Sequence, residues 1–410
     1  MQTGTIRVLD YWLGIPLCAM LTVVRRIGGQ RRTPPQRILF LKFIEQGATV
    51  LAQDAIARAA ARVGRDNLFC CVFESNRAIL DVLGAVPAAN VLTIRDRRLV
   101  TFVLDFLRTI AVMRSRRIDT VIDMEFFSRA SAIFSFLSGA TTRVGLHRFT
   151  GELPYRGDLM THRIQYSPHA HISQQYALLA EAAFLEPTDE PLLKFPLRNV
   201  AEAAPLSRFT PTEAELAATR ARLMPPGATA SPIVLLNPNA SDLLPLRKWQ
   251  GARFAELARR ILGAYPHARI GVTGAPAEQA AAEQLCRDID GGQRVVSLAG
   301  RTSLRELLTL YTLADVLVTN DSGPAHFASL TPVHTVVMFG PETPQLFGSL
   351  APSTTIIWKE LACSPCVSVF NHRLSPCRNN VCMQAITVDE VFAAVSAALS
   401  GRRPSAPTQH

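Results

Sequence analysis

The chain has 410 residues, of which 48% are hydrophobic, and a formal net charge of +10. This length is ample for two domains with separate cores, and the composition is that of a globular protein. The basic residues are not interleaved with aromatic side chains in a stripe, which excludes nucleic-acid recognition as the expected function.

Residues 1–36 combine an apolar segment with a basic cluster. Residues 11–24 carry no charge, and four arginines follow, Arg25, Arg26, Arg31 and Arg32. The run is short for a transmembrane helix, contains Gly14 and Pro16, and lacks a small-residue cleavage site. The pattern therefore predicts an amphipathic helix lying in the inner leaflet of a membrane, with the arginine cluster on anionic headgroups. A soluble helix packed on the following domain is the alternative.

The next segment, residues 37–190, alternates short apolar runs with helical patterns. Runs typical of buried strands occur at residues 38–44, 68–73, 91–94, 120–124 and 143–146. Helical patterns lie between them, at residues 50–63, 76–83, 99–116 and 128–137. This alternation predicts a doubly wound parallel sheet.

Prolines mark a connection over residues 186–211, and we place a linker at residues 191–230. A second α/β series fills residues 231–399, with strands expected at 233–236, 268–272, 295–298, 314–318 and 334–339. The sequence thus predicts two Rossmann-like domains facing a cleft, with ligands bound beyond the carboxyl ends of the strands. The polar tail, residues 400–410, is predicted to be disordered.

The most informative motif follows the expected strand 314–318. It consists of Asp321, Ser322, Gly323, Pro324 and, two residues later, His326. A strand end followed by a helix start exposes backbone N–H groups to an anion, and a glycine allows a phosphate to approach closely. Asp321 is better suited to accept hydrogen bonds from sugar hydroxyls. The simpler interpretation is an ordinary helix N-cap.

Eight cysteines are present, and the last four have the spacing C-x2-C-x10-C-x4-C, at Cys363, Cys366, Cys377 and Cys382. Four thiols at such a spacing could hold a structural zinc ion. The spacing is not that of a standard zinc ribbon, so reduced, locally packed thiols are the default expectation.

The order of these motifs resembles glycosyltransferase family 9, the bacterial heptosyltransferases of lipopolysaccharide core assembly. The matching pieces run from Leu41-Lys42-Phe43 to the Cys-Ser-Pro-Cys of residues 363–366, and include Arg247-Lys248-Trp249 and the 319–326 motif. The resemblance implies the two-domain GT-B fold, inversion at the anomeric carbon, and no metal or other cofactor in the active site. It also implies a nucleotide-sugar donor such as ADP-heptose and a lipid-linked glycan acceptor.

In this resemblance the carboxyl half binds the donor. Cationic Arg247 or Lys248 would stabilise the leaving diphosphate together with the 321–326 motif. Glu278 would bind the ribose hydroxyls, or serve only as a first-turn glutamate, and His326 would face the diphosphate or pack beneath the loop. The remaining residues assigned to donor binding are Asn239, Ser241, Thr273 and Gly274.

The chain departs from the family pattern where an Asp, the expected general base, normally follows the glycine of the first loop. Here Ala48 follows Gly47. Three carboxylates at expected strand ends are the candidate replacements, Glu45, Asp123 and Glu125, and we favour Glu45 because it lies in the same loop.

Two other functions remain open from the sequence. Ala48 motivates a catalytically degenerate protein that binds nucleotide-sugar or glycolipid during assembly. A nucleotide-dependent oxidoreductase is the third possibility, but no G-x-G-x-x-G follows the first strand of either half.

Overall fold

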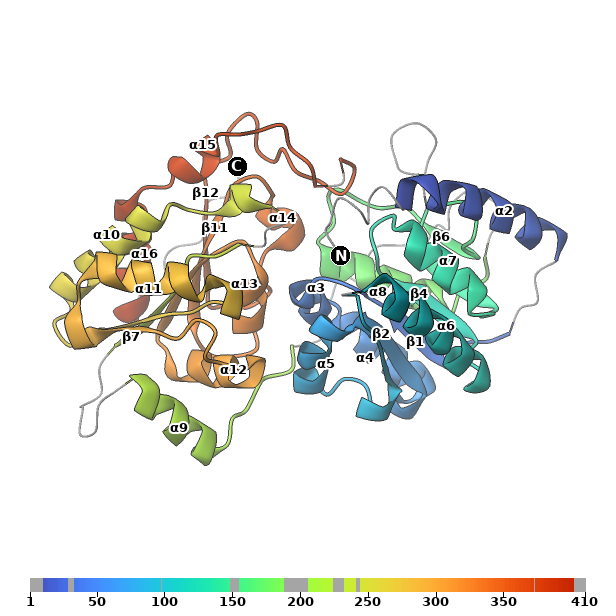
Figure 1. Cartoon of the computed structure of the whole chain (residues 1–410), viewed down its shortest axis with the longest axis horizontal. Helices are drawn as coiled ribbons and strands as arrows, with labels where there is room; N and C mark the ends of the chain where they lie inside the picture. Colours follow the sequence, from blue (N-terminus) through green and yellow to red (C-terminus); the bar gives the residue numbers. More distant parts are fainter. Residues whose placement is uncertain are drawn as a thin grey trace. The chain divides into compact units, whose positions relative to one another are not determined.

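The computed structural model describes residues 10–28, 33–96, 98–147, 155–187, 206–223, 232–240, 244–371 and 373–401. The chain divides into two compact units, Met1–Leu206 (unit 1) and Ser207–His410 (unit 2). Each unit contains one six-stranded sheet whose paired strands are all parallel (Figure 1).

The sheet of unit 1 has the strand order β3-β2-β1-β4-β5-β6. Its strands are β1 (Ile38–Leu41), β2 (Leu68–Phe73), β3 (Val91–Ile94), β4 (Thr120–Asp123), β5 (Thr142–Leu146) and β6 (His162–Ile164). Its helices are α2 (Gly14–Ile27), α3 (Gln46–Leu51), α4 (Gln53–Val63), α5 (Arg77–Leu83), α6 (Leu99–Ser115), α7 (Arg129–Leu137) and α8 (Ile172–Ala182). The five strands predicted here are confirmed, and β6 is an additional edge strand.

Apolar runs become central strands in unit 1 because both faces of the sheet are covered. On one face, Leu39 and Leu41 of β1 pack with Met113 of α6 and Phe134 of α7. Helix α7 contacts both α2 and α6, and lies between them in Figure 1. Helices α4 and α8 contact each other and the central strands on the other side.

The sheet of unit 2 has the order β12-β11-β10-β7-β8-β9. Its strands are β7 (Ile233–Asn237), β8 (Arg269–Val272), β9 (Val295–Ser297), β10 (Val316–Asn320), β11 (His334–Phe339) and β12 (Thr354–Trp358). Its helices are α9 (Glu213–Leu223), α10 (Gly251–Ala264), α11 (Gln279–Ile289), α12 (Leu304–Leu313), α13 (Gly323–Ala328), α14 (Pro344–Phe347), α15 (Val381–Gln384) and α16 (Val388–Leu399). The predicted strands are again confirmed, with β12 added at the edge.

The core of unit 2 forms between its sheet and helices α10, α11 and α16. Val234, Leu236 and Val318 of the central strands pack there with Phe254 and Leu257 of α10. These side chains are fully buried. Burial of this kind is the main favourable term that holds the sheet and its helices together.

Helix α2 corresponds to the predicted N-terminal amphipathic helix. Cys18 and Leu21 are buried against Ala132 and Ile133 of α7, so one face of the helix packs on unit 1. Its other face is exposed. Among the described residues, no helix combines the length and the apolar character needed to cross a bilayer.

Candidate active site

The loops that follow β7 and β10 meet where the strand order of unit 2 reverses. Leu236 of β7 pairs with Val318 of β10, so both strands end at the same edge. The Asn320 side chain joins the two loops: its amide donates to the carbonyl oxygens of Pro238 (3.0 Å) and Asn239 (3.2 Å). Open parallel sheets bind ligands at this position.

A third loop, after β8, reaches the same edge. The Asn239 amide donates to the Thr273 carbonyl oxygen at 3.2 Å. A Cβ placed on Gly274 would lie 2.8 Å from Asn239 Nδ2 and 3.0 Å from Glu278 Oε2, so a larger residue would have to displace these two side chains. Glu278 Oε2 accepts a hydrogen bond from Ala275 N at 2.7 Å. Asn239, Thr273, Gly274 and Glu278 are therefore neighbours, whereas Ser241 lies outside the described residues.

Arg247 lies in a buried cluster of charged side chains. Its Nε is 3.4 Å from Asp321 Oδ2, its Nη1 donates to the Asp321 carbonyl oxygen at 3.3 Å, and its Nη2 pairs with Glu342 Oε2. Arg373 Nε lies 3.6 Å from Glu342 Oε1. The Asp321 and Glu342 side chains are 4% and 2% exposed. In this state Asp321 faces a guanidinium rather than solvent, and the charge of Arg247 is already balanced.

Burial changes the protonation of this cluster. It raises the pKa of Glu342 to about 8, with the Asp321 charge adding to the rise and Arg247 opposing it. Burial likewise raises the pKa of Asp321, against the attraction of Arg247. Burial lowers the pKa of Arg373 to about 10. The cluster therefore gains or loses a proton near neutral pH.

Glu342 should make the stability of the protein depend on pH. Its carboxyl titrates at about 4.5 in the unfolded chain and about 8 in the folded one, so its stabilising contribution is complete below the lower pKa and lost as pH rises through the upper. We expect the free energy of unfolding of the wild type to fall across this window by on the order of a few kcal/mol more than that of Glu342→Gln. Urea denaturation at several pH values measures both slopes. Asp321 is present in both proteins, so the difference between the two slopes reports on Glu342. Equal slopes would contradict the assignment.

The 322–326 segment forms the N-terminal part of the six-residue helix α13. Ser322 is the N-cap, its hydroxyl donates to the Asn320 carbonyl oxygen at 3.2 Å, and Pro324 lies in the first turn. His326 is buried and Lys248 is half-buried. Gly323 begins the helix, so the backbone N–H groups predicted to receive an anion are at the edge formed by β7 and β10.

In unit 1 the loops after β1 and β4 also meet where the strand order reverses. Lys42, with a side chain 2% exposed, lies 3.2 Å from Glu45 Oε2 and 3.4 Å from Glu125 Oε1. Glu125 Oε1 also accepts from the backbone of Phe43 (2.6 Å) and Ile44 (3.3 Å). Glu45 and Glu125 are thus brought together around an ammonium group that the sequence had not marked as a site residue.

The two glutamates differ in exposure and backbone geometry. The Glu45 side chain is 20% exposed and that of Glu125 is 7% exposed. Glu45 has φ 71°, a left-handed conformation that is uncommon for a residue with a Cβ. Such a strained position is typical of functional sites, where the surrounding contacts hold it.

Asp123 does not share this loop environment. It is fully buried, pairs with Arg156, and accepts from Ser131 Oγ (2.8 Å) and Glu125 N (3.0 Å). Asp123 is thus enclosed by protein groups, whereas Glu45 keeps part of its side chain exposed. The contacts of Asp123 hold β4, α7 and Glu125 in place.

The four C-terminal cysteines are free thiols. Burial raises the pKa of Cys382, and the charges of Cys363, Cys366 and Cys377 add to the rise. Cys366 Sγ lies 3.4 Å from Ser375 Oγ, and Cys377 Sγ donates to the Asn379 carbonyl oxygen at 3.1 Å. Across the described ranges, no group of three or more Cys, His, Asp or Glu side chains is arranged to hold a metal ion.

Two doubly wound units, each with polar loops at the reversal of strand order, define the GT-B class of fold. Residues 106–373 match glycosyltransferase family 9 (heptosyltransferase), and the chain belongs to this family. The resemblance predicted from the motif order is therefore confirmed.

Among curated proteins, the chain is 28% identical over 170 residues to lipooligosaccharide heptosyltransferase 2 of Campylobacter jejuni, covering 39% of this chain and 49% of that protein. The chain thus spans about half the length of this curated relative. The structure of E. coli ADP-heptose lps heptosyltransferase II has a TM-score of 0.68 and 18% identity, over 89% of this chain and 99% of that one. E. coli heptosyltransferase WaaC with ADP has a TM-score of 0.59 and 17% identity, over 88% and 99%.

Proposed function

We propose that this protein is an inverting glycosyltransferase that moves a heptose or related sugar from a nucleoside-diphosphate sugar to a lipid-linked glycan. The acceptor would be a lipopolysaccharide core or another surface polysaccharide. The observation that carries the proposal is that Asn320 joins β10 to the β7 loop and Asn239 joins the β7 loop to the β8 loop, in a chain of family 9. A solved relative is described with ADP, which fits a nucleotide at this edge.

In this proposal unit 2 binds the donor. The backbone N–H groups at the start of α13, with Ser322 and Gly323, receive the diphosphate, and Arg247 or Lys248 supplies positive charge to the leaving group. Because Arg247 is paired with Asp321 and Glu342, its guanidinium is held in position before the donor arrives. Glu278 and Asn239 line the adjoining loop, where the ribose would lie.

Unit 1 supplies the general base. We assign this role to Glu45, which is the more exposed of the two carboxylates around Lys42. It would take the proton from the acceptor hydroxyl as that oxygen attacks the anomeric carbon and the nucleoside diphosphate departs. Lys42 and Glu125 position the Glu45 side chain through the contact at 3.2 Å and the backbone bonds of the loop. A base must lie within hydrogen-bond reach of the proton it removes.

Two further features complete the proposal. The reaction needs no metal ion, because helix N–H groups and arginine carry the developing charge. The protein works on the cytoplasmic face of the bacterial inner membrane as a peripheral enzyme. Transfer from ADP-heptose to a lipid-linked acceptor, measured with and without a chelator, tests both chemistry and metal requirement. Loss of transfer on chelation, restored by a metal, would contradict the metal-independent mechanism.

A non-catalytic nucleotide-sugar or glycolipid-binding role is the second candidate. It is favoured by Ala48, which replaces the carboxylate expected in the first loop. Donor-dependent transfer in the assay above would exclude it, whereas nucleotide binding without transfer to any lipid-linked acceptor would support it.

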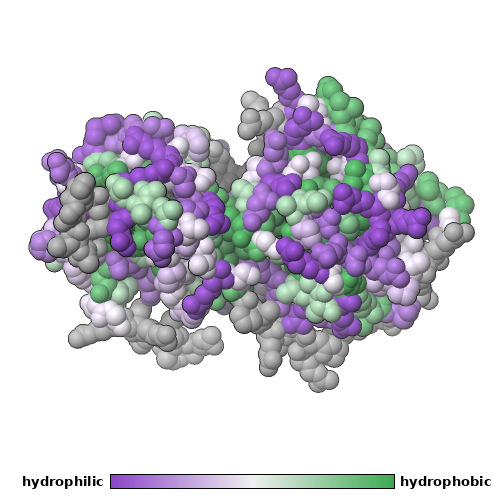
Figure 2. All heavy atoms as spheres, turned by 90° about the horizontal axis from the view of Figure 1, so that it is seen from below, coloured by the Kyte–Doolittle hydropathy of each residue, from purple (hydrophilic) through white to green (hydrophobic). Residues whose placement is uncertain are grey.

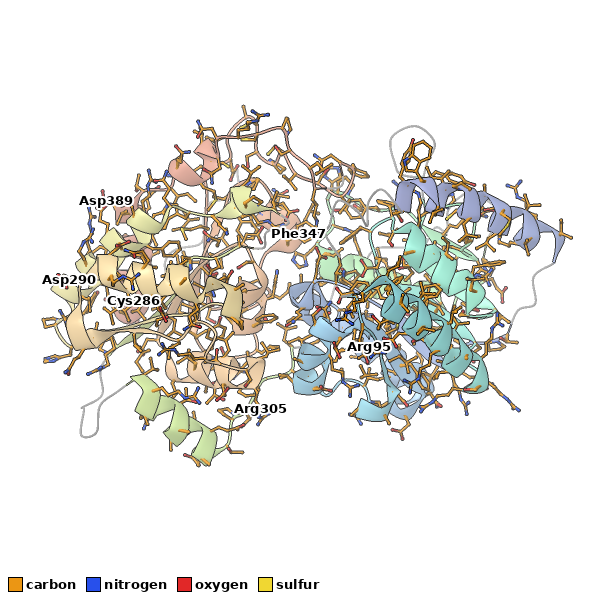
Figure 3. The ribbon with its side chains drawn as sticks, viewed as in Figure 1. Arg95, Cys286, Asp290, Arg305, Phe347 and Asp389 are labelled. Carbon is orange, nitrogen blue, oxygen red and sulfur yellow. The ribbon has the colours of Figure 1, made fainter. Side chains whose placement is uncertain are left out.

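The donor site predicts a nucleotide-dependent rise in stability. A nucleoside diphosphate present at about 100 times its Kd should stabilise the wild type by about 2.7 kcal/mol. Asp321→Asn should bind more weakly, because Arg247 loses a charged partner that holds it. Asp389→Asn, whose side chain is 81% exposed on α16, is the matched control and should respond as the wild type does (Figure 3).

Thermal denaturation across a panel of nucleoside diphosphates measures these shifts. A midpoint unchanged by every nucleotide in the folded wild type would contradict the donor site. A shift fully retained in Asp321→Asn would remove Asp321 from it.

A further inference from the structure

Helix α6 presents an apolar surface to solvent over its N-terminal half. The exposed side chains are Leu99 (51%), Val100 (71%), Val103 (44%), Leu104 (59%) and Leu107 (56%). Their spacing places them along one face of the helix. The same turns bury polar side chains, since Asp105 and Thr109 face the protein. Contiguous exposed apolar side chains of this kind mark an interaction surface. We call these five residues the α6 stripe.

The segment that contains the stripe has an excess of positive charge. Residues 95–117 contain seven arginines and two aspartates. One of these aspartates, Asp105, pairs with Arg95, which is labelled in Figure 3. Arg95 donates to the Asp105 carboxylate from Nε (2.7 Å), Nη2 (2.8 Å) and its backbone N (3.0 Å). Arg98 and Arg108, at the start and side of the stripe, are exposed. An apolar face edged by arginines is complementary to anionic lipid headgroups over an acyl layer.

Helix α2 adds a second apolar surface to the same unit. Met20 and Ile27 of this helix, and Trp12 and Leu13 just before it, are 54–81% exposed, and Arg26 next to Ile27 is exposed too. Because α7 contacts both α2 and α6, the two helices belong to one helical layer of unit 1. Figure 2 shows strongly hydrophobic side chains gathered along one side of this unit.

Aromatic side chains link helix α6 to the loop after β1, which contains the proposed base Glu45. Helix α6 follows β3 and so begins at the carboxyl edge of the sheet, the edge at which Glu45 lies. Beneath it, Phe102 contacts Phe73 (6.3 Å between ring centroids), and Phe73 stacks on Phe43 (4.9 Å). A surface bound by the stripe would therefore present a lipid-linked acceptor at this edge.

We propose that the α6 stripe docks unit 1 onto an anionic phospholipid bilayer, with its leucine and valine side chains entering the acyl boundary and Arg98 and Arg108 contacting headgroup phosphates. This role rests on the proposed use of a lipid-linked acceptor. It adds a second contact to the one expected of α2, so that the unit is held at two places rather than tethered at its N-terminus.

The test is co-sedimentation of the full chain with vesicles of phosphatidylglycerol and phosphatidylcholine. The double variant Val100→Asp, Leu104→Asp should lower the vesicle partition coefficient at least about tenfold, because each change removes an aliphatic side chain that would enter the acyl layer and adds a negative charge. Leu374→Asp, at an exposed leucine of unit 2 (51%), is the matched control and should bind as the wild type does. Binding of the wild type should weaken on adding salt and on omitting phosphatidylglycerol.

Two readouts separate this proposal from other outcomes. The nucleotide-induced thermal shift should be equal in the double variant and the wild type. This shift tests the proposed donor site, and vesicle partitioning tests the α6 stripe, so failure of one proposal can be told from failure of the other. Wild-type partitioning by the double variant would overturn the proposal and leave α2 as the only contact. A dimer in solution that the double variant converts to a monomer, with no binding of either protein to vesicles, would assign the stripe to a second copy instead.

Discussion

Glu45→Gln is expected to abolish transfer while leaving donor binding intact. Removing the proposed general base should lower kcat by about 10²- to 10⁴-fold, because the acceptor hydroxyl then attacks without losing its proton to a positioned carboxylate. The amide keeps the size of the side chain and can still accept a hydrogen bond from Lys42, now 3.2 Å from Glu45 Oε2. Steady-state transfer kinetics and the nucleotide-induced thermal shift together measure the two effects.

The matched control is Glu74→Gln. Glu74 is an exposed carboxylate directly after β2, the strand beside β1, and lies outside the contacts of Lys42 described above. The Glu74→Gln variant should transfer sugar at the wild-type rate. Turnover close to normal in Glu45→Gln would remove Glu45 from the mechanism, and a parallel experiment on Glu125→Gln would then become decisive.

Asp123→Ala is expected to be the most destabilising single change considered for unit 1. The Arg156 and Asp123 side chains are 2% and 0% exposed, so the substitution leaves a guanidinium buried without its carboxylate. Losing one partner of a buried pair costs about 3–5 kcal/mol. Ser131 Oγ and Glu125 N lose their acceptor as well. Urea denaturation of the wild type and the variant measures the change in free energy of unfolding.

Two comparisons identify the cause of that loss. Replacing both partners, Asp123→Leu with Arg156→Met, should recover much of the stability, because no charge is then left unpaired. Glu215→Gln breaks the exposed pair with Arg305 (side chains 30% and 48% exposed; Figure 3) and should change stability little. A loss in Asp123→Ala no larger than that in Glu215→Gln would contradict the argument.

The fold was predictable because its signals are local. Each central strand is a continuous apolar run, such as residues 233–236, and the helices between them have amphipathic spacing. The strands that were not predicted, β6 and β12, lie at sheet edges. β6 has three residues and β12 is only half-buried, so neither produces a strong apolar pattern.

The candidate site was predictable only in part. Residues within one loop, such as Asp321, Ser322 and Gly323, form a motif that can be recognised directly. Glu342 was missed because its partner Arg247 is 95 positions away, and no spacing rule joins them. Lys42 was missed for the same reason, since Glu125 lies 83 positions later. The burial of Asp123 depends on Arg156 from a third segment.

Helix α6 shows a different limit of prediction from sequence. The amphipathic pattern over residues 99–116 predicts a helix with one apolar face, and such a face is expected to point at the core. In the structure Ile110 and Met113 do so, but the leucines and valines of the first turns face solvent. Periodicity identifies the faces of a helix, whereas the neighbours decide which face is covered.

The two sheets repeat one architecture. Read from the first strand of each unit, β3-β2-β1-β4-β5-β6 corresponds to β9-β8-β7-β10-β11-β12. Each sheet also has its own hydrophobic core, one containing Leu39 and Met113 and the other Val234 and Phe254. Substitutions in the loops of one unit therefore leave the core of the other unit unchanged. Under the proposed division of roles, the acceptor loops of unit 1 can change without altering the packing that supports the nucleotide-binding loops of unit 2.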